Sequence, residues 1–355
     1  MQDVILAIDI GGSKYMAGLV DGQGQVLDAA RYPWGNVTTG EAVLAHIRQA
    51  AQAMLDAHPG IKPRAIGATI PGLADPRTGM WVEASFSGVG DVAVGPALQA
   101  AFGAPAFIDN DGQACALAEK LYGACKDVKD FLYLTVSNGC GGAIFMGDLL
   151  YYGASGNAGE IGHVCVEPQG RQCNCGARGC LEMHAAGPAL VKNYLEVGGL
   201  SQLQGQAPNA KAIADLARGG DPAALETYRL EGVYLGRAIA AACNLLNPSK
   251  VIIGGGISLA FDLFEASLWD TLRQYIYWNA NQQLTIQPTA LGYNGGLLGA
   301  AAVAVCGLEN RHGWGMVESR KPGTIKTPKA APERPGPYRR AGTPNAKGQS
   351  LGETR

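Results

Sequence analysis

The stretch Gly159-Glu160-Ile161-Gly162-His163, with the later Cys173-Asn174-Cys175-Gly176-Ala177-Arg178-Gly179-Cys180-Leu181-Glu182, decides how the rest of the chain is interpreted. Three thiols and one imidazole fall within eighteen positions. Three cysteines and one histidine are a common tetrahedral ligand set for structural Zn²⁺, and the glycines allow the tight turns that bring thiolates to one ion. The pattern therefore predicts a zinc loop over residues 159–182. The expected ligands are His163, Cys173, Cys175 and Cys180.

Two carboxylates, Glu160 and Glu182, flank this cluster without being good ligands for a soft metal site. One interpretation is that zinc fixes the loop, which then presents these carboxylates and an imidazole edge to a ligand. Two alternatives stay open: a zinc ribbon that only holds the fold, and a redox-active Cys-x-Cys pair. Spacing alone does not decide whether the loop contacts a substrate.

Composition limits the class of protein. A length of 355 residues predicts about two domains, and 47% hydrophobic residues allow a sizeable core. A net charge of −2 gives no general attraction to nucleic acid. No apolar run reaches the roughly 18 residues of a membrane span, and the chain opens on a strand-like run, Val4–Ile8, without an export signal. Free cysteines and no signal indicate the cytoplasm.

Strands and helices alternate along the chain. Expected strands are 4–8, 15–20, 65–70, 106–108, 131–136 and 251–253, and expected helices are 39–58, 113–121, 186–197, 221–246 and one beginning at 295. Glycine-rich turns follow strands near residues 9, 137 and 254. Open α/β sheets bind ligands at such strand ends. The pattern predicts two α/β domains, 1–112 and 113–294, and the helix 295–307 is a candidate to return to the first domain.

The last segment, 308–355, differs in composition, because Pro, Gly, Lys, Arg, Thr and Ser replace aliphatic residues. This composition predicts a disordered basic tail. A solvated extension is the default interpretation, and a weak contact with a polyanion is the alternative.

Glycine loops and carboxylates offer phosphate and metal chemistry. The turn Asp9-Ile10-Gly11-Gly12-Ser13-Lys14 lacks Walker A spacing, but its glycines let backbone N–H groups approach phosphate oxygens, and its acidic residue suits a hydrated Mg²⁺. Loops 137–142 and 254–256 are similar. Each is a weak signal alone; together they indicate nucleotide binding, which needs donors for several phosphates.

Asp111 stands where a predicted strand meets a predicted helix. It has two interpretations: the N-cap of that helix, which aspartate fills well, or a general base that takes the proton of an attacking hydroxyl. The neighbours Asp109 and Asn110 are suited to bind hydroxyls or to cap the same helix.

In this order, the motifs resemble the ROK family of sugar kinases and repressors. The resemblance covers about residues 4 to 306, and the cysteine block with the preceding Gly-Glu-x-Gly-His is its most specific part. It implies an actin-like, ribonuclease H-like ATPase fold whose two domains close on a cleft. It also implies ATP and Mg²⁺, with phosphate transferred to a sugar hydroxyl.

Carried over by position, the resemblance makes Asp111 the catalytic base, and it implies that His163 contacts both zinc and sugar. The implied sugar-binding residues are Asn110, Glu160, His163, Glu182, Gly72 and Ser85. The implied ATP-binding residues are Asp9, Gly11, Gly12, Ser13, Lys14, Asn138, Gly139, Gly254, Gly255 and Gly256.

Two departures from the family pattern bear on activity. The phosphate loop, usually Gly-Thr-Gly, reads Ser137-Asn138-Gly139, which changes the bulk and the hydrogen-bonding group of the middle residue. Ala84-Ser85 stands where a Pro-Asn pair is expected, so a sugar contact is changed. Both leave open an unusual sugar or a reduced turnover.

The sequence thus predicts an ATP-dependent hexose kinase, with glucose as the leading substrate and N-acetylmannosamine, N-acetylglucosamine and fructose as alternatives. Repressor members carry a winged helix-turn-helix before the Asp-x-Gly-Gly turn, which here begins at residue 9, so we expect a kinase. We expect no specific nucleic acid or membrane partner, and relatives indicate a homodimer. A non-catalytic sugar-binding regulator and a zinc-ribbon protein that uses its basic tail are the rival hypotheses.

Overall fold

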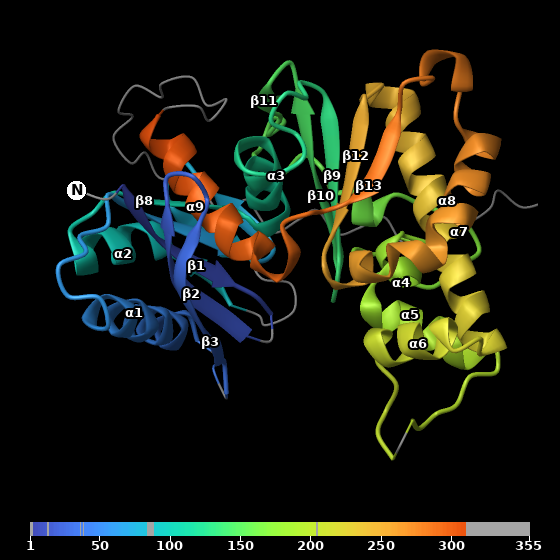
Figure 1. Cartoon of the computed structure of the whole chain (residues 1–355), viewed down its shortest axis with the longest axis horizontal. Helices are drawn as coiled ribbons and strands as arrows, with labels where there is room; N and C mark the ends of the chain where they lie inside the picture. The colour runs from blue at the N-terminus through green and yellow to red at the C-terminus, as the bar shows by residue number, and fades with distance from the viewer. Residues whose placement is uncertain are drawn as a thin grey trace, which may run out of the picture. The chain divides into compact units, whose positions relative to one another are not determined.

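The computed structural model describes residues 3–12, 14–35, 37, 39–83, 89–203 and 205–309. Within these ranges the chain forms two five-stranded sheets and one three-stranded sheet, with helices on the faces of the two larger sheets (Figure 1). Three predictions lie outside the described residues: Ser13, Ser85 and the tail from residue 310. No helix among the described residues is long and apolar enough to cross a membrane.

The first sheet has the strand order β3-β2-β1-β4-β8. In that order the strands span Val26–Pro33, Lys14–Asp21, Val4–Ile10, Ala65–Ile70 and Ala106–Asn110. Strands β1 and β2 form an antiparallel hairpin, and β4 pairs in parallel with both β1 and β8. Parallel pairing brings the carboxyl ends of β1, β4 and β8 to one edge of the sheet.

The second sheet has the order β11-β10-β9-β12-β13. Its strands span Leu149–Leu150, Cys140–Met146, Phe131–Val136, Lys250–Gly254 and Thr285–Pro288. Since β9 and β12 are parallel neighbours, the glycine loops that follow them lie at the same edge. The small third sheet contains β5 (Leu73–Asp75), β6 (Met80–Glu83) and β7 (Gly90–Val92).

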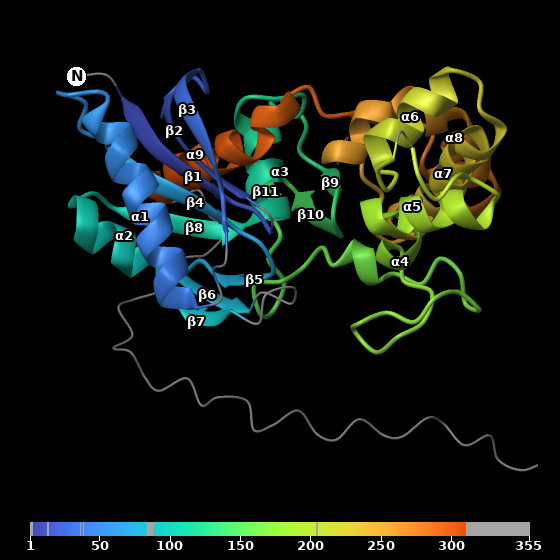
Figure 2. The ribbon, with the colours of Figure 1, turned by 90° about the horizontal axis from the view of Figure 1, so that it is seen from below.

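Helices cover both large sheets (Figures 1 and 2). Against the first sheet pack α1 (Gly40–Asp56), α2 (Val94–Phe102), α3 (Asp111–Leu121) and α9 (Gly295–Leu308). The later helices are α4 (Glu182–Ala185), α5 (Gly187–Glu196), α6 (Ala210–Arg218), α7 (Pro222–Leu246) and α8 (Phe261–Tyr275). Single 3₁₀ turns are η1 (Ile161–His163), η2 (Gly256–Ala260), η3 (Trp278–Ala280) and η4 (Gly292–Asn294).

Strand β1 shows how the sequence assigns a side chain to a layer. Its alternate residues Leu6 and Ile8 pack in the core with α1, whereas Ile5 and Ala7 pack in a second core with α3 and α9. Because side chains alternate across a strand, Asp9 belongs to the face of α3 and α9. Strand parity therefore directs this carboxylate toward the helices rather than toward α1.

The core around α3 and α9 is shared by both large sheets. It contains Ala7 of β1 together with Phe131 and Tyr133 of β9 and Ile252 of β12. Helix α9 approaches β4 closely at Gly67, because a Cβ on this glycine would overlap a backbone carbonyl of α9. The helices that carry site residues are thus fixed against both sheets at once.

Predicted and observed elements agree best where an apolar run is flanked by turn residues. Strands over 65–70 and 131–136 are confirmed. The helix expected from Gln113 begins two residues earlier, at Asp111, and α9 continues through Leu308, where the tail was predicted to begin. Both differences lie at helix ends, where local propensity is weakest as a signal.

One buried acid in α7 has no evident local role. Glu231 is 0% exposed, and neither of its carboxylate oxygens has a hydrogen-bond partner in the described part of the chain. Burial raises the pKa of Glu231 well above its usual range. A buried polar group without a partner lowers stability.

We expect Glu231→Met to raise the free energy of unfolding by about 1–3 kcal/mol at neutral pH. The gain grows as pH rises above the usual glutamate pKa of 4.5, because there the folded protein holds a proton that the unfolded chain releases. Denaturant unfolding at pH 5 and pH 8 measures both effects. Glu265→Met, at an exposed site on α8, is the control; a destabilised Glu231→Met would contradict the expectation.

Candidate active site

The corner between β8 and α3 positions the predicted base. Asn110, not Asp111, is the N-cap: its Oδ1 accepts the N–H groups of Gly112 (2.9 Å) and Gln113 (3.4 Å). Asp111 is the first residue of the helix. The interpretation of Asp111 as the cap is therefore wrong. The neighbouring asparagine is the N-cap, and Oδ1 of Asp111 accepts the N–H of the next residue, Gly112, at 2.8 Å.

The Asp111 carboxyl has an unusual affinity for protons. Its pKa is raised to about 6, mainly by burial and also by the carboxylates of Asp9 and Glu160, against hydrogen bonds from Gly112 and Asn110 that lower it. Like charges disfavour ionisation only when they are near. The three acids, which come from three different segments, therefore influence one another directly.

Three glycines explain how these segments come so close. A Cβ built on Gly112 of α3 would lie 3.3 Å from the carbonyl oxygen of Gly142 in β10, and one on Gly159 would overlap that same oxygen. The backbones of two separate segments therefore pack against the backbone of Gly142. Since Asp111 precedes Gly112 and Glu160 follows Gly159, the contact places both acids beside one point of β10.

The same logic accounts for the Gly-Glu-x-Gly-His motif. A Cβ on Gly162 would overlap the carbonyl oxygen of Cys140 at the start of β10. The two glycines of the motif are thus required for packing, and the residues after them, Glu160 and His163, remain exposed. The Nε2 atom of His163 lies 3.9 Å from Oε2 of Glu160. The motif presents an imidazole and a carboxylate side by side.

The four predicted zinc ligands converge. The ligand atoms of His163, Cys173, Cys175 and Cys180 all lie within 4.8 Å of one another, with Sγ of Cys173 3.7 Å from Nδ1 of His163 and Sγ of Cys175 3.6 Å from Sγ of Cys180. Sulfur and nitrogen atoms at these separations fit a tetrahedral Zn²⁺ with bonds of about 2.0–2.3 Å. Because Nδ1 faces the thiols, Nε2 of His163 stays directed toward Glu160.

Not every cysteine of this loop joins the cluster. A cysteine outside the predicted ligand set is most simply expected to be a small core residue, but Cys165 is exposed, so this expectation is wrong for Cys165. It pairs as an isolated antiparallel bridge with Cys180 through the backbone, which fixes the loop but leaves its thiol outside the ligand set.

Glu182 joins the metal loop to the predicted phosphate loop. Its Oε2 accepts the backbone N–H of Cys140 at 3.0 Å, and a Cβ on Gly139 would lie 2.7 Å from the same atom. The backbone N–H of Gly187 donates to the Ser137 carbonyl at 2.7 Å. Loop 137–140 is therefore held from both sides, with the side chain of Asn138 exposed.

Asp9 occupies the end of β1 that strand parity assigns to it. Its Oδ1 accepts the hydroxyl of Thr69 at 2.7 Å, and burial raises its pKa, against lowering by Thr69, Lys14 and Arg31. A Cβ on Gly296, in the first turn of α9, would overlap the Asp9 carboxylate. This pairing suits a carboxylate, since helix N-termini carry partial positive charge.

The turn after Asp9 satisfies part of its own hydrogen bonding. The N–H of Gly11 donates to the Lys14 carbonyl at 3.0 Å, and the indole Nε1 of Trp34 donates to the Gly11 carbonyl at 2.7 Å. The Gly11 groups thus shape the hairpin turn. Gly12 and Lys14 are exposed at its tip.

Packing requires a glycine at two of the three positions 254–256, at the end of β12. A Cβ on Gly254 would overlap the hydroxyl of Tyr133, and one on Gly255 would overlap the carbonyl of Val136 in β9. A Cβ on Gly256 meets no atom within 4 Å. Gly256 is therefore the glycine of this loop whose space is open to a ligand.

Sequence reasoning missed residues that hold the site from behind. Thr69 binds Asp9 and Tyr152 binds Asp109. Gly72, which was predicted as a sugar-binding residue, accepts Nδ2 of Asn110 through its carbonyl at 2.8 Å. A threonine in the otherwise apolar run 65–70 was an available signal for Thr69. No local pattern marks Tyr152, because its partner is distant in sequence.

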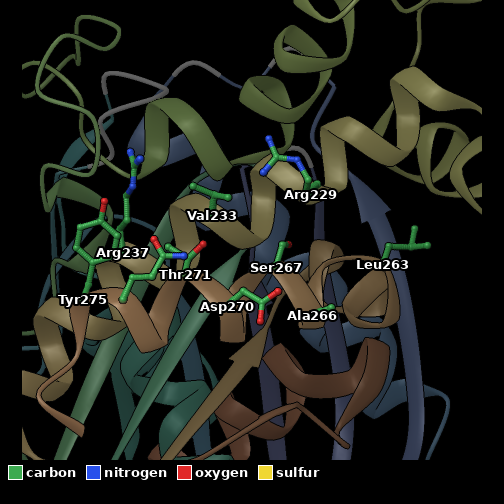
Figure 3. A pocket seen from close by; sticks show the side chains of 10 residues that line it. Arg229, Val233, Arg237, Leu263, Ala266, Ser267, Asp270, Thr271 and Tyr275 are labelled. Carbon is green, nitrogen blue, oxygen red and sulfur yellow. The ribbon is translucent and has the colours of Figure 1, made fainter.

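A groove of about 480 Å³ between α7 and α8 lies elsewhere (Figure 3). Its lining includes Arg229, Arg237 and Tyr275 and none of the predicted site residues. The arginines already have partners, with Arg229 bound to Glu226 at 2.7 Å and Arg237 to Glu167 at 3.0 Å. The groove is separate from the cluster of carboxylates.

The chain belongs to the ROK family, whose model matches residues 5–306. It is 31% identical over 309 residues to a glucokinase of Thermotoga maritima, covering 84% of this chain and 96% of that protein. A glucokinase of Streptomyces griseus, solved with glucose and AMPPNP, superposes with a TM-score of 0.74 at 28% identity, covering 85% and 99%. The resemblance and the actin-like α/β fold class are confirmed.

Regulators also match. The DNA-binding transcriptional dual regulator NagC of Escherichia coli K12 is 38% identical over 199 residues, which cover 55% of this chain and 49% of NagC. The chain thus spans about half the length of that relative. The match to the Thermotoga maritima glucokinase covers a larger share of both proteins than the match to NagC does.

We expect Cys175→Ser to lose bound zinc and to destabilise the chain, because structural metal binding is coupled to folding. Metal analysis of purified protein, expected to give about one zinc per wild-type chain, and thermal unfolding measure both effects. Cys165→Ser is the matched control, since this exposed thiol of the same loop lies outside the cluster. Well-folded wild-type protein without zinc would exclude the site.

Proposed function

We propose that this chain is an ATP-dependent hexose kinase that transfers the γ-phosphate of ATP to a sugar hydroxyl, with glucose as the leading substrate. The observation that carries the proposal is the Asp111 carboxyl, which lies at the start of α3 beside Glu160 with a pKa raised to about 6. A general base works best when its pKa lies near the working pH, because a sufficient fraction is then ionised and the ionised form still binds a proton well. Similarity to glucokinases over most of the chain supports it.

In the proposed reaction, the sugar lies against Glu160, His163 and Glu182, whose oxygens and Nε2 atom bind its hydroxyls. Asp111 accepts the proton of the attacking hydroxyl, which lets oxygen bond to phosphorus as the ADP leaving group departs. Phosphoryl transfer depends mostly on positioning and charge neutralisation. Zn²⁺, when bound by His163 and the three cysteines, orders the sugar loop.

The nucleotide side of the proposal uses glycine loops at neighbouring strand ends. Backbone N–H donors for phosphates come from the turn after Asp9 and from the loop around Asn138 and Gly139. Gly256 leaves open space for the nucleotide. Mg²⁺, when bound near Asp9, neutralises phosphate charge. Asp9 fits this role because Thr69, which donates a hydrogen bond to its carboxylate, is neutral and leaves carboxylate charge for a cation.

We further propose that the two large sheets are the cores of two domains, 1–112 and 113–294, with helix 295–307 packed on the first. Domain closure would exclude water and so limit wasteful ATP hydrolysis. A homodimer is proposed from the family alone.

The second candidate is a sugar-binding regulator without catalysis. It is favoured by Asn138, which replaces a family threonine in the phosphate loop, and by the match to NagC. The same sugar residues would serve either function. The difference lies in whether phosphate transfer occurs.

A coupled assay of ADP release across glucose, N-acetylmannosamine, N-acetylglucosamine and fructose separates the two candidates. We expect sugar-dependent ADP release with one preferred sugar. Calorimetric sugar binding without ADP release from any sugar would instead support the regulator.

We expect Asp111→Asn to lower turnover by at least about 10²-fold while sugar binding survives, because the amide keeps the shape but cannot take the proton. The variant should also be more stable at pH 7.5 by about 1–3 kcal/mol, since the folded carboxyl has a raised pKa and its ionised form is disfavoured. Steady-state kinetics, calorimetry and thermal unfolding measure these quantities. Turnover like that of wild type would remove Asp111 from the base role.

The pH dependence of kcat/KM follows from the same carboxyl. We expect kcat/KM for the sugar to fall as pH decreases below about 6, because protonated Asp111 cannot act as a base. In Glu160→Gln the residual activity should show this limb at lower pH, since loss of a neighbouring negative charge lowers the Asp111 pKa. A profile that is flat down to pH 5 would be inconsistent with the assignment.

A further inference from the structure

A buried hydrogen bond links the base segment to the loop that carries Glu160. The hydroxyl of Tyr152 donates to Oδ2 of Asp109 at 2.6 Å, and the two residues are 5% and 0% exposed. Oδ1 of Asp109 accepts the backbone N–H of Asn110 at 2.8 Å. One carboxyl group therefore binds the β8–α3 corner with one oxygen and the distant loop with the other.

A second hydrogen bond joins the same two segments. Nε2 of Gln113, in the first turn of α3, donates to the Gly156 carbonyl at 3.1 Å, and Gln113 is buried. Both bonds start within two residues of Asp111 and end in the segment just before Glu160. They are thus placed to set the separation of these two acids.

The loop itself needs such fixing. Gly153, Gly156 and Gly159 have φ angles of +70°, +93° and +102°. Glycine adopts positive and negative φ about equally, so these three residues do not by themselves hold the loop in this conformation. Its contact with Gly142 is backbone on backbone, which offers no side-chain interlocking. Within the loop, the N–H of Ala158 donates to the Tyr152 carbonyl at 3.1 Å. A shift of Tyr152 would therefore also shift Ala158, two residues before Glu160.

Keeping a carboxyl at this place is costly. Burial raises the pKa of Asp109 to about 7, although hydrogen bonds from Tyr152 and Asn110 lower it. An apolar residue would pack there at less cost. The carboxyl offers what an apolar residue lacks, namely two acceptors that connect two segments.

We propose that Asp109 and Tyr152 are positioning residues, which fix the Glu160 loop relative to Asp111 so that the sugar hydroxyl meets the base. The proposal rests on the proposed kinase function for its kinetic consequence only. Neither residue contacts the reacting atoms in this scheme. Their effect passes through the loop backbone and the end of β8.

Tyr152→Phe removes one hydroxyl and no packing volume. We expect it to raise the KM for sugar and to lower kcat, with kcat/KM reduced about tenfold or more. The KM for ATP should stay within about twofold, since the proposed nucleotide loops lie on other elements. A purely structural loss would move both KM values together or neither.

The matched control is Tyr228→Phe. This buried tyrosine, 1% exposed, donates one hydrogen bond to the Ala210 carbonyl at 2.9 Å in the region of α6 and α7. We expect it to lose comparable stability without a change in sugar KM. Asp109→Asn supplies a second test, because Tyr152→Phe should cost less in that background than in wild type if the two side chains act through one bond.

Amide hydrogen exchange over residues 153–160 tests the link without catalysis. We expect faster exchange in Tyr152→Phe than in wild type and in Tyr228→Phe. If the wild-type chain phosphorylates no sugar, the kinase proposal fails while faster exchange still supports the link. Exchange and sugar KM equal to those of wild type in Tyr152→Phe would overturn the inference.

Discussion

Backbone contact at Gly142 of β10 is the constraint on which the candidate site depends. Gly112 and Gly159 both pack against the Gly142 carbonyl, and Gly162 packs on the carbonyl of Cys140, two residues earlier in β10. A side chain at any of these glycines would separate the layers. Because none is present, α3 and the metal loop approach one strand closely enough for acids from distant segments to share one site.

This closeness concentrates negative charge. Asp9, Asp111 and Glu160 come from β1, α3 and the metal loop, and burial together with like charge raises the pKa of Asp111. Such an arrangement lowers local stability, and the shared core of α3, α9 and both sheets supports it. Sites that bind cations and activate hydroxyls commonly carry strain of this kind.

Glu182 gives the predicted phosphate loop and the predicted zinc loop a common support. Its carboxylate binds the Cys140 N–H and lies against Gly139, so the backbone path of the loop is set independently of the side chain at position 138. Asn138 is exposed there. The departure from the family pattern therefore changes the group offered to a ligand more than it changes the loop, which is compatible with phosphate transfer.

The sequence alone determined most strands and helices, the four clustered candidate metal ligands and the family, because period, turn residues and motif spacing are local properties. Only the tertiary structure decided that Asn110 rather than Asp111 caps α3, that Cys165 is exposed, and that Asp109 meets Tyr152. These depend on contacts between segments; Asp109 and Tyr152 are 43 residues apart. Sequence periodicity does not show which distant segment will pack against a given glycine.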